Sequence, residues 1–248
     1  MGANHTCLIS STIVSNMRDR TRAHVITFGF AAQAEIKVSN FENRTENDKP
    51  AGVAFKLEYG GSFVPIRVSG CFGKTVPYAA GAAAAVGIIF GMHLVRISEN
   101  LSYYEAPPHR LKLISGIKGT YILDDSYNAS PLSMAEAIET AKSLKAPRKI
   151  AILGDMLEIG KYAVEAHENI GKLVAKVFDI LITVGPRAKF FGEAASDHGF
   201  GRRNILNFDT AEEVKSKIQN LIKKGDLVLI KGSWAMHLDT IVEEIRQV

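Results

Sequence analysis

The stretch Tyr121-Ile122-Leu123-Asp124-Asp125-Ser126-Tyr127-Asn128-Ala129-Ser130-Pro131 decides the fold of this chain. It begins with a short apolar run that ends at two carboxylates. It closes with a serine before a proline, a favourable N-cap residue followed by the residue best tolerated at the first helical position. Apolar side chains then recur at helical spacing, at Met134, Ile138, Ala141 and Leu144. The stretch therefore predicts a strand, a polar loop and a helix.

The loop of this unit, residues 124–130, is the strongest candidate for a functional site. A loop between a strand and a helix holds its polar side chains at the carboxyl edge of a sheet, where open α/β proteins bind ligands. Asp, Asn and Ser are also common turn residues, so an ordinary turn is the alternative. Two adjacent acids with a tyrosine and an asparagine are denser than a turn requires, and we favour a ligand site.

Residues from 111 onward alternate short apolar runs with helix-compatible segments. The runs are Tyr121–Leu123, Ile150–Leu153, Ile180–Val184 and Leu227–Ile230. Unbroken apolar runs are typical of strands buried on both faces, and their alternation with helices indicates βαβ crossovers. The sequence thus predicts an α/β fold with a Rossmann-like, mainly parallel sheet in its C-terminal part.

Polar residues and glycines follow each of the four predicted strands. They are Asp124-Asp125, Gly154-Asp155, Gly185-Pro186 and Lys231-Gly232-Ser233. Because the junctions of a parallel sheet lie at one edge, that edge would gather three carboxylates, one lysine and one serine. Such a crevice suits a ligand with phosphates, sugar hydroxyls and ammonium groups.

Residues 24–72 have the pattern of antiparallel β structure without evident chemistry. The strand-like segments are His24–Phe28, Glu35–Ser39, Val53–Tyr59 and Phe63–Val68, the last two separated by Gly60-Gly61 at hairpin spacing. The charged link from Glu42 to Lys49 is expected to be a solvated loop. This region is a β-rich part that precedes the parallel sheet.

Gly73-Lys74-Thr75 is similar to the end of a phosphate-binding loop, but the full motif is absent. A Walker A loop has a glycine five residues before its Gly-Lys pair, and that position is Val68 here. A loop that leads into an Ala-rich helix at residues 77–91 is the better interpretation.

A domain boundary is expected near Pro107-Pro108, where two prolines make a stiff linker. This divides the chain into residues 1–104 and 105–248. Arg110 follows the linker and is a candidate binder of phosphate or carboxylate, because guanidinium suits bidentate oxyanions. A surface or interdomain ion pair is the alternative for this residue.

Composition excludes several classes of protein. The 248 residues are 46% hydrophobic and 23% charged, which is ordinary for a globular protein. The net charge of +4 comes without a basic run interleaved with aromatics, so no nucleic-acid partner is expected. The apolar region Ala79–Val95 falls short of the ~20 residues of a spanning helix, so no membrane insertion is expected. Two cysteines are too few for a disulfide framework and favour a cytoplasmic protein.

Two further residues have ordinary explanations. His167-Glu168 begins like a zinc-binding helix motif, but the matching position four residues on is Gly171, and we predict no metal site. His167 is expected to cap or pack. Trp234 is expected to be a packed aromatic, with stacking on a ligand ring as the alternative.

The segment Asp124 to Met134 closely resembles the signature of the Mur ligases, in the form carried by their D-alanyl-D-alanine-adding members. The resemblance continues through Leu153-Gly154-Asp155-Met156-Leu157-Glu158-Ile159-Gly160, Glu165-Ala166-His167 and Lys231-Gly232-Ser233, in family order. It covers most of the chain from about Arg22 onward. It implies an ATP-dependent amide ligase of peptidoglycan precursor synthesis, in which ATP phosphorylates the carboxylate of a UDP-N-acetylmuramoyl-tripeptide and the amine of D-Ala-D-Ala attacks the acyl phosphate.

The resemblance also implies site residues and cofactors. By position, Asp125, Tyr127 and Asn128 match residues that hold the adenosine part of ATP, and Arg110 is a further ATP-binding candidate. Substrate-binding candidates are Asp155 and Lys231, Gly232 and Ser233, placed to meet the dipeptide or the acyl phosphate. Mg²⁺ is implied with ligands mostly outside this chain, no catalytic residue is assigned, and a monomer is expected.

The chain also departs from the family pattern. His109 stands where relatives carry glycine, and Trp234 where they carry Arg or Gln. A Gly-x-x-Gly-Lys-Thr-Thr loop does not occur, and the N-terminal UDP-binding domain and the carbamoylated lysine are not matched. We therefore expect the end of the central ATPase domain followed by the complete C-terminal domain, inactive on its own. A non-catalytic module that binds nucleotide or dipeptide, and a generic doubly wound nucleotide-binding protein, are the alternatives.

Overall fold

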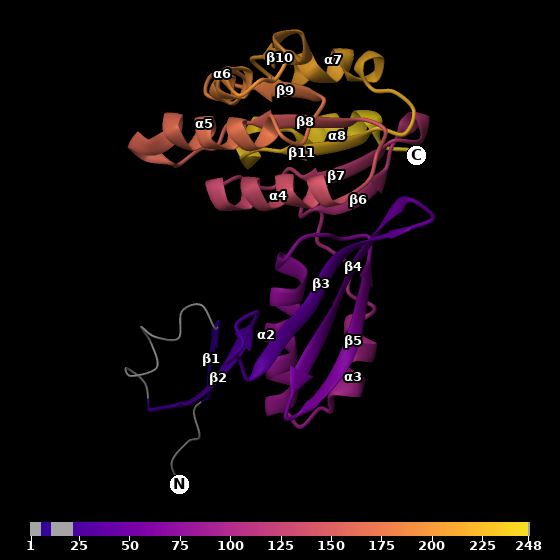
Figure 1. Ribbon diagram of the computed structural model, residues 1–248, viewed down its shortest axis with the longest axis vertical. Coiled ribbons are helices and arrows are strands. Elements are labelled where there is room, and N and C mark those ends of the chain that lie inside the picture. The colour runs from indigo at the N-terminus through magenta and orange to yellow at the C-terminus, as the bar shows by residue number, and fades with distance from the viewer. Residues whose placement is uncertain (1–5, 11–21, 248) are drawn as a thin grey trace. The chain divides into compact units, whose positions relative to one another are not determined.

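The computed structural model describes residues 6–10 and 22–247 of the chain. The chain falls into two compact units, one of Met1–Arg44 with Ala51–Glu105 and the other of Thr45–Pro50 with Ala106–Val248. Each unit is built on its own sheet (Figure 1).

The first unit contains a five-stranded sheet in the order β1-β2-β3-β4-β5. Its strands are β1 (Thr6–Ser10), β2 (His24–Gly29), β3 (Ile36–Glu46), β4 (Lys49–Tyr59) and β5 (Ser62–Ser69). β4 and β5 are antiparallel around the Gly60-Gly61 turn, whereas β2 pairs in parallel with both β1 and β3. The expectation of an antiparallel sheet is therefore wrong for β2. Alternation reports which side chains are buried and says nothing of the direction of the neighbouring strand.

β3 and β4 form a long hairpin, where the sequence predicted a solvated loop from Glu42 to Lys49. Only Asn47 and Asp48 lie between the two strands. Both have positive φ, 51° and 59°, as a type I′ turn requires at its two central positions. Asn and Asp tolerate this conformation, so the charged segment continues as strand up to the turn. The loop prediction was wrong because charge was taken to mean irregular structure.

Helices α2 (Thr75–Ile89) and α3 (Leu94–Leu101) pack on the first sheet, α2 beside β2 and α3 beside β5 (Figure 1). α2 begins two residues before its predicted start, directly after the exposed Lys74. The Gly73-Lys74-Thr75 segment is thus the entry to a helix, as predicted from the missing upstream glycine.

The second unit contains a six-stranded sheet in the order β10-β9-β8-β11-β7-β6. Its strands are β6 (Lys112–Ser115), β7 (Tyr121–Asp125), β8 (Lys149–Gly154), β9 (Ile180–Val184), β10 (Ile205–Phe208) and β11 (Leu227–Lys231). β7, β11, β8, β9 and β10 are parallel, and only β6 is antiparallel to its neighbour. The predicted mainly parallel sheet is confirmed, with both edge strands added to the four that were predicted.

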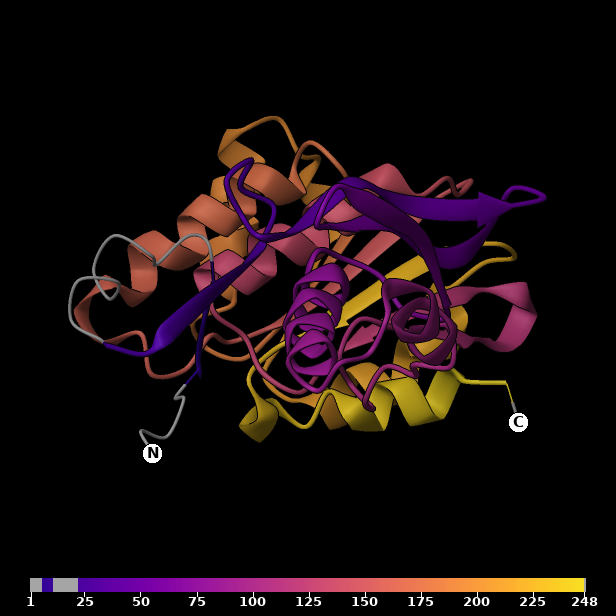
Figure 2. The same cartoon turned by 90° about the horizontal axis from the view of Figure 1, so that it is seen from below.

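Helices cover both faces of this sheet (Figures 1 and 2). They are α4 (Pro131–Ser143), α5 (Ala163–Val174) and α6 (Lys189–Asp197) on one face, and α7 (Ala211–Leu221) and α8 (Asp239–Ile245) on the other. Short 3₁₀ helices are η2 (Ile117–Gly119), η3 (Gly160–Tyr162), η4 (Arg202–Asn204) and η5 (Trp234–Met236). A core of fully buried aliphatic residues from the strands meets α7 and α8.

The start of α4 follows the prediction from Ser130 and Pro131. The Ser130 hydroxyl accepts a hydrogen bond from the Ser133 N–H, and the Ser133 hydroxyl accepts one from the Ser130 N–H, which makes a capping box. Met134 and Ile138 are buried on the inner face of the helix. This cap fixes where the loop after β7 ends. None of the helices within residues 22–247 has the length and apolar character that spanning a bilayer requires.

Candidate functional site

The carboxylate of Asp125 is committed to partners inside the protein. β7 and β11 are neighbours in register, so Lys231 lies opposite Asp125, and its Nζ is 2.5 Å from Oδ2. The same ammonium donates to the carbonyl of Asn128 at 2.9 Å, and the Leu111 N–H donates to Oδ1 at 3.1 Å. Burial raises the pKa of the Asp125 carboxyl, while the ammonium and the N–H act to lower it. Lys231, itself buried, thus ties β11 to the loop after β7.

The neighbouring acid, Asp124, holds a second segment. Its Oδ2 lies 2.9 Å from Nδ1 of His109, and its Oδ1 accepts from the Ser126 hydroxyl at 2.7 Å and from the Ser126 N–H at 3.2 Å. The Tyr127 N–H donates to the carbonyl of His109 at 3.2 Å. Both acids of the pair therefore fasten residues 109–111 to the end of β7.

Several exposed side chains lie near these buried acids. Tyr127 and Trp234 are 45% and 48% exposed, with ring centroids 5.8 Å apart. The guanidinium carbon of Arg110 lies 3.9 Å from the centre of the Tyr127 ring, and Asn128 is exposed beside it. The prediction that Trp234 is a packed aromatic is therefore wrong. The short η5 helix begins at Trp234 and leaves half of the indole in solvent.

At the end of β8, Asp155 is 2% exposed and serves the neighbouring loop. Its Oδ1 accepts hydrogen bonds from the backbone N–H groups of Arg187 at 3.0 Å and Ala188 at 2.6 Å. These N–H groups lie just before α6, where a helix leaves donors without partners. Gly185 has a φ of 108°, and a side chain there would collide with Asp155. Asp155 therefore links the ends of β8 and β9.

Ser233 and His167 form hydrogen bonds with the backbone of the loop after β8. The Ser233 hydroxyl accepts from the Leu157 N–H at 2.9 Å, and its own N–H donates to the Asp155 carbonyl at 3.1 Å. The buried His167 accepts from the Met156 N–H at Nε2, 3.1 Å away, and lies 2.6 Å from the Ala163 carbonyl at Nδ1. Burial lowers the pKa of His167, which keeps the ring neutral. His167 thus packs and supports the loop, as predicted.

Gly232 allows the strand ends to approach. A side chain there would meet Leu238 at 2.7 Å and the backbone of Gly154 at 3.0 Å, so the chain after β11 approaches the end of β8 this closely because position 232 has no side chain.

All eight predicted site residues thus lie in the second unit, at the carboxyl ends of its strands or in the segment that Asp124 and Asp125 hold there. They divide into two kinds. The buried ones are bonded to backbone or to each other, and they are Asp125, Asp155, Lys231, Gly232 and Ser233. The exposed ones, Arg110, Tyr127 and Asn128, are free to contact a ligand.

His109 and Trp234 were not among the predicted site residues, yet their rings lie 5.7 Å apart at this edge. Both were visible in the sequence as departures from the family pattern. Only the fold shows that the two departures meet. Among the described residues, no three His, Cys, Asp or Glu side chains converge in a way that would hold a metal ion, so these residues do not fit a Mg²⁺ site of their own.

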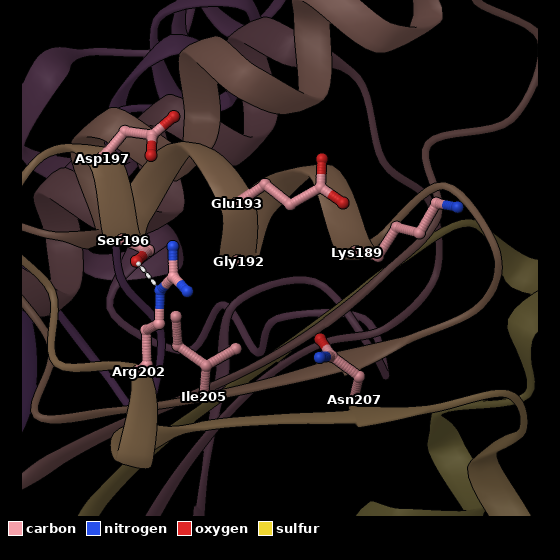
Figure 3. Close-up of a pocket in the computed structure, with 8 residues that line it drawn as sticks. All are labelled: Lys189, Gly192, Glu193, Ser196, Asp197, Arg202, Ile205 and Asn207. Carbon is pink, nitrogen blue, oxygen red and sulfur yellow. Dashed lines mark hydrogen bonds between the residues drawn. The ribbon is translucent and has the colours of Figure 1, made fainter.

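A separate hollow of about 390 Å³ lies between α6 and β10 (Figure 3). Its lining carries charges of both signs and consists of Lys189, Gly192, Glu193, Ser196, Asp197, Arg202, Ile205 and Asn207. Arg202 donates from Nε to the Ser196 hydroxyl at 3.1 Å. None of the residues predicted from the sequence lines this hollow, because it is formed by a helix face and an edge strand that was not predicted.

The family described as "Mur ligase, glutamate ligase domain" matches residues 109–234, which is half of the chain and includes the strand ends described above. The chain belongs to the Mur ligase family. Curated relatives are named UDP-N-acetylmuramoyl-tripeptide–D-alanyl-D-alanine ligase. The Bacillus subtilis protein is 33% identical over 185 residues, 74% of this chain and 39% of that protein. The Rickettsia prowazekii protein is 26% identical over 249 residues, 98% of this chain and 51% of that protein.

Solved structures of Mur ligases share the fold. MurF from Thermotoga maritima in complex with ADP has a TM-score of 0.79 at 21% identity, covering 98% of this chain and 53% of that one. MurF from Acinetobacter baumannii has a TM-score of 0.82 at 22% identity, covering 97% and 52%. The chain thus spans about half the length of the Mur ligases that it matches.

Proposed function

We propose that this chain forms part of an ATP-dependent amide ligase that adds D-Ala-D-Ala to a UDP-N-acetylmuramoyl-tripeptide through an acyl phosphate. The observation that carries the proposal is the 33% identity to the Bacillus subtilis enzyme of that name, over 74% of this chain. The likeness to MurF solved with ADP supports a nucleotide site. Residues 1–104 would be the end of the central ATPase domain and 105–248 the C-terminal domain.

The site residues would divide between the two ligands. Tyr127, Asn128 and Arg110 would contact the nucleotide directly, since they are exposed together, and Asp125 would hold their loop in place. Asp155 and residues 231–233 would shape the edge that receives the dipeptide or the acyl phosphate. Mg²⁺ would be held mostly by residues that this chain does not provide. With ATP and a UDP-linked precursor as substrates, the reaction would take place in the cytoplasm, and we propose a monomer.

The test is a chimera in which the aligned part of this chain, 74% of its length, replaces the matching 185-residue segment of the Bacillus subtilis ligase. We expect ATP-dependent joining of D-Ala-D-Ala to the muramoyl tripeptide, measured by phosphate release and product mass. The Bacillus ligase with that segment deleted is the control. A folded chimera that binds nucleotide without ligating would favour the non-catalytic binding module instead.

A further inference from the structure

His109 has a strained backbone that its packing role does not explain. Its φ is +63°, and that of Leu111 is +47°, a region that residues other than glycine rarely occupy. Buried partners hold both residues there, Asp124 through the imidazole and Asp125 through the Leu111 N–H. Residues kept in strained conformations by their surroundings cluster at ligand sites, so the position of His109 needs a functional reason.

The hydrogen bonds of His109 determine which ring nitrogen carries the proton. Asp124 is 1% exposed and, as a carboxylate, can only accept at the 2.9 Å contact with Nδ1. The Ser126 hydroxyl, 3.2 Å from Nδ1, already donates its proton to Asp124. Nδ1 therefore carries the hydrogen, and Nε2 of the neutral ring is an acceptor. Among the described residues, Nε2 has no hydrogen-bond partner, and the side chain is 26% exposed.

Aromatic surface surrounds this free acceptor. The indole of Trp234 lies 5.7 Å from the imidazole and 5.8 Å from the Tyr127 ring, and both aromatic rings are about half exposed. Arg110 adds a positive charge against Tyr127. Flat apolar faces, one free ring acceptor and one cation together suit a planar heterocycle that has an amino group and carries phosphate.

We propose that His109 is a specificity-determining residue that accepts a hydrogen bond from the exocyclic amino group of an adenine ring lying against Trp234 and Tyr127. Asp124 is its positioning residue, because it fixes the tautomer. The inference rests on the proposed nucleotide site and adds the choice of base to it.

The experiment titrates the full chain with three purine nucleotides that differ in the group at C6; IMP, in addition, carries a hydrogen on N1. AMP has the amino group, purine riboside monophosphate has hydrogen there, and IMP has a carbonyl. Trp234 is the single tryptophan of the chain, so its indole N–H resonance reports binding directly, including weak binding. At mildly alkaline pH we expect AMP to bind roughly tenfold more tightly than purine riboside monophosphate, the effect of one hydrogen bond.

Two variants separate recognition from structure. His109→Phe keeps an aromatic ring beside Trp234 but has no acceptor, so AMP and purine riboside monophosphate should bind equally. Asp124→Asn should reverse the preference. The Ser126 N–H needs an acceptor, which turns the amide oxygen of the new side chain toward it and the NH₂ toward His109. Nδ1 then becomes an acceptor and Nε2 a donor, so IMP should bind more tightly than AMP. A loss of structure alone would not produce this reversal.

The outcomes distinguish the two proposals. If no nucleotide moves the indole resonance or those of Tyr127 and Asn128, the nucleotide site itself is wrong. If nucleotides bind but the wild-type chain does not distinguish AMP from purine riboside monophosphate, only the role of His109 is overturned. Far-ultraviolet circular dichroism and thermal unfolding of each variant identify one that has failed to fold, and in that case the three-nucleotide comparison on the wild-type chain decides.

Discussion

The ends of β7 and β8 use similar residues for different results. Asp125 is the last residue of β7, and Asp155 directly follows β8. Both acids are buried and bonded to a neighbouring segment, Asp125 to Lys231 at the end of β11 and Asp155 to the backbone before α6. After β7, however, the next residues are exposed, with Tyr127 at 45%. After β8, Met156 is fully buried and its N–H is bonded to His167. The loop after β7 thus has exposed side chains, whereas the loop after β8 begins with a buried one.

The difference teaches that polar density marks a site without saying which residues touch the ligand. A buried carboxylate requires partners, and in this fold the partners are backbone N–H groups and one lysine of adjacent loops. The acids therefore hold the loops of this edge in place, and Tyr127 and Asn128, which follow Asp125, remain exposed. Substitutions of the buried acids and their partners should mainly lower stability, and substitutions of the exposed residues should mainly weaken binding.

The largest effect is expected for Lys231→Met. This change leaves the Asp125 carboxylate buried without its cation, and removing one partner of a buried pair costs about 3–5 kcal/mol of the free energy of unfolding. Chemical denaturation of the full chain measures it. The double variant Lys231→Met with Asp125→Leu should recover most of the loss, because two apolar side chains replace the pair. A single variant as stable as the wild type would show that the pair does not hold the loop.

Asp155→Ala should have the next largest effect and lower the free energy of unfolding by about 2–3 kcal/mol. It removes the acceptor of the Arg187 and Ala188 N–H groups. The N–H of the buried Ala188 is then left without a hydrogen-bond partner. Asp197→Ala, at the exposed end of α6, is the matched control and should stay within about 0.5 kcal/mol. Equal losses in both variants would mean that Asp155 is no more than a surface acid.

The lowered pKa of the buried His167 should make the stability of the protein depend on pH. This pKa is lowered from 6.5 by burial, so the unfolded chain binds a proton more readily than the folded one. The contribution of the neutral His167 to stability is fully present above pH 6.5 and is lost as the pH falls through the lowered folded pKa. The free energy of unfolding then falls by at most about 1.4 kcal/mol per pH unit. His167→Gln should flatten the pH dependence of unfolding in that range. His198→Gln, at an exposed histidine, should leave it unchanged.

Much of this edge could be predicted from the sequence because local patterns determine it. The apolar run before Asp124, the Ser130 cap and the repeated strand-helix alternation led to β7, α4 and the parallel sheet. The direction of β2 could not be predicted, since burial alternates in the same way in parallel and antiparallel pairs. Nor could the meeting of His109 and Trp234, because it depends on how separate loops end at one edge.

The smallest effect on stability should come from a substitution in the exposed loop after β7. Asn128→Ala removes an exposed side chain whose Oδ1, among the described residues, bonds only the adjacent Ala129 N–H. The free energy of unfolding should therefore change by less than about 0.5 kcal/mol.

In the ligase chimera, the same change should raise the KM for ATP, by a factor that corresponds to roughly 1–3 kcal/mol if a nucleotide group is left without its partner. The KM for D-Ala-D-Ala should stay the same, because Asn128 lies in the loop assigned to the nucleotide. Lys231→Met is the contrasting variant, since it disturbs the loop after β7 and the end of β11 together and should affect both substrates. An Asn128→Ala chimera whose KM rises only for D-Ala-D-Ala would mean that the exposed loop after β7 receives the dipeptide, and that the nucleotide binds elsewhere on the edge.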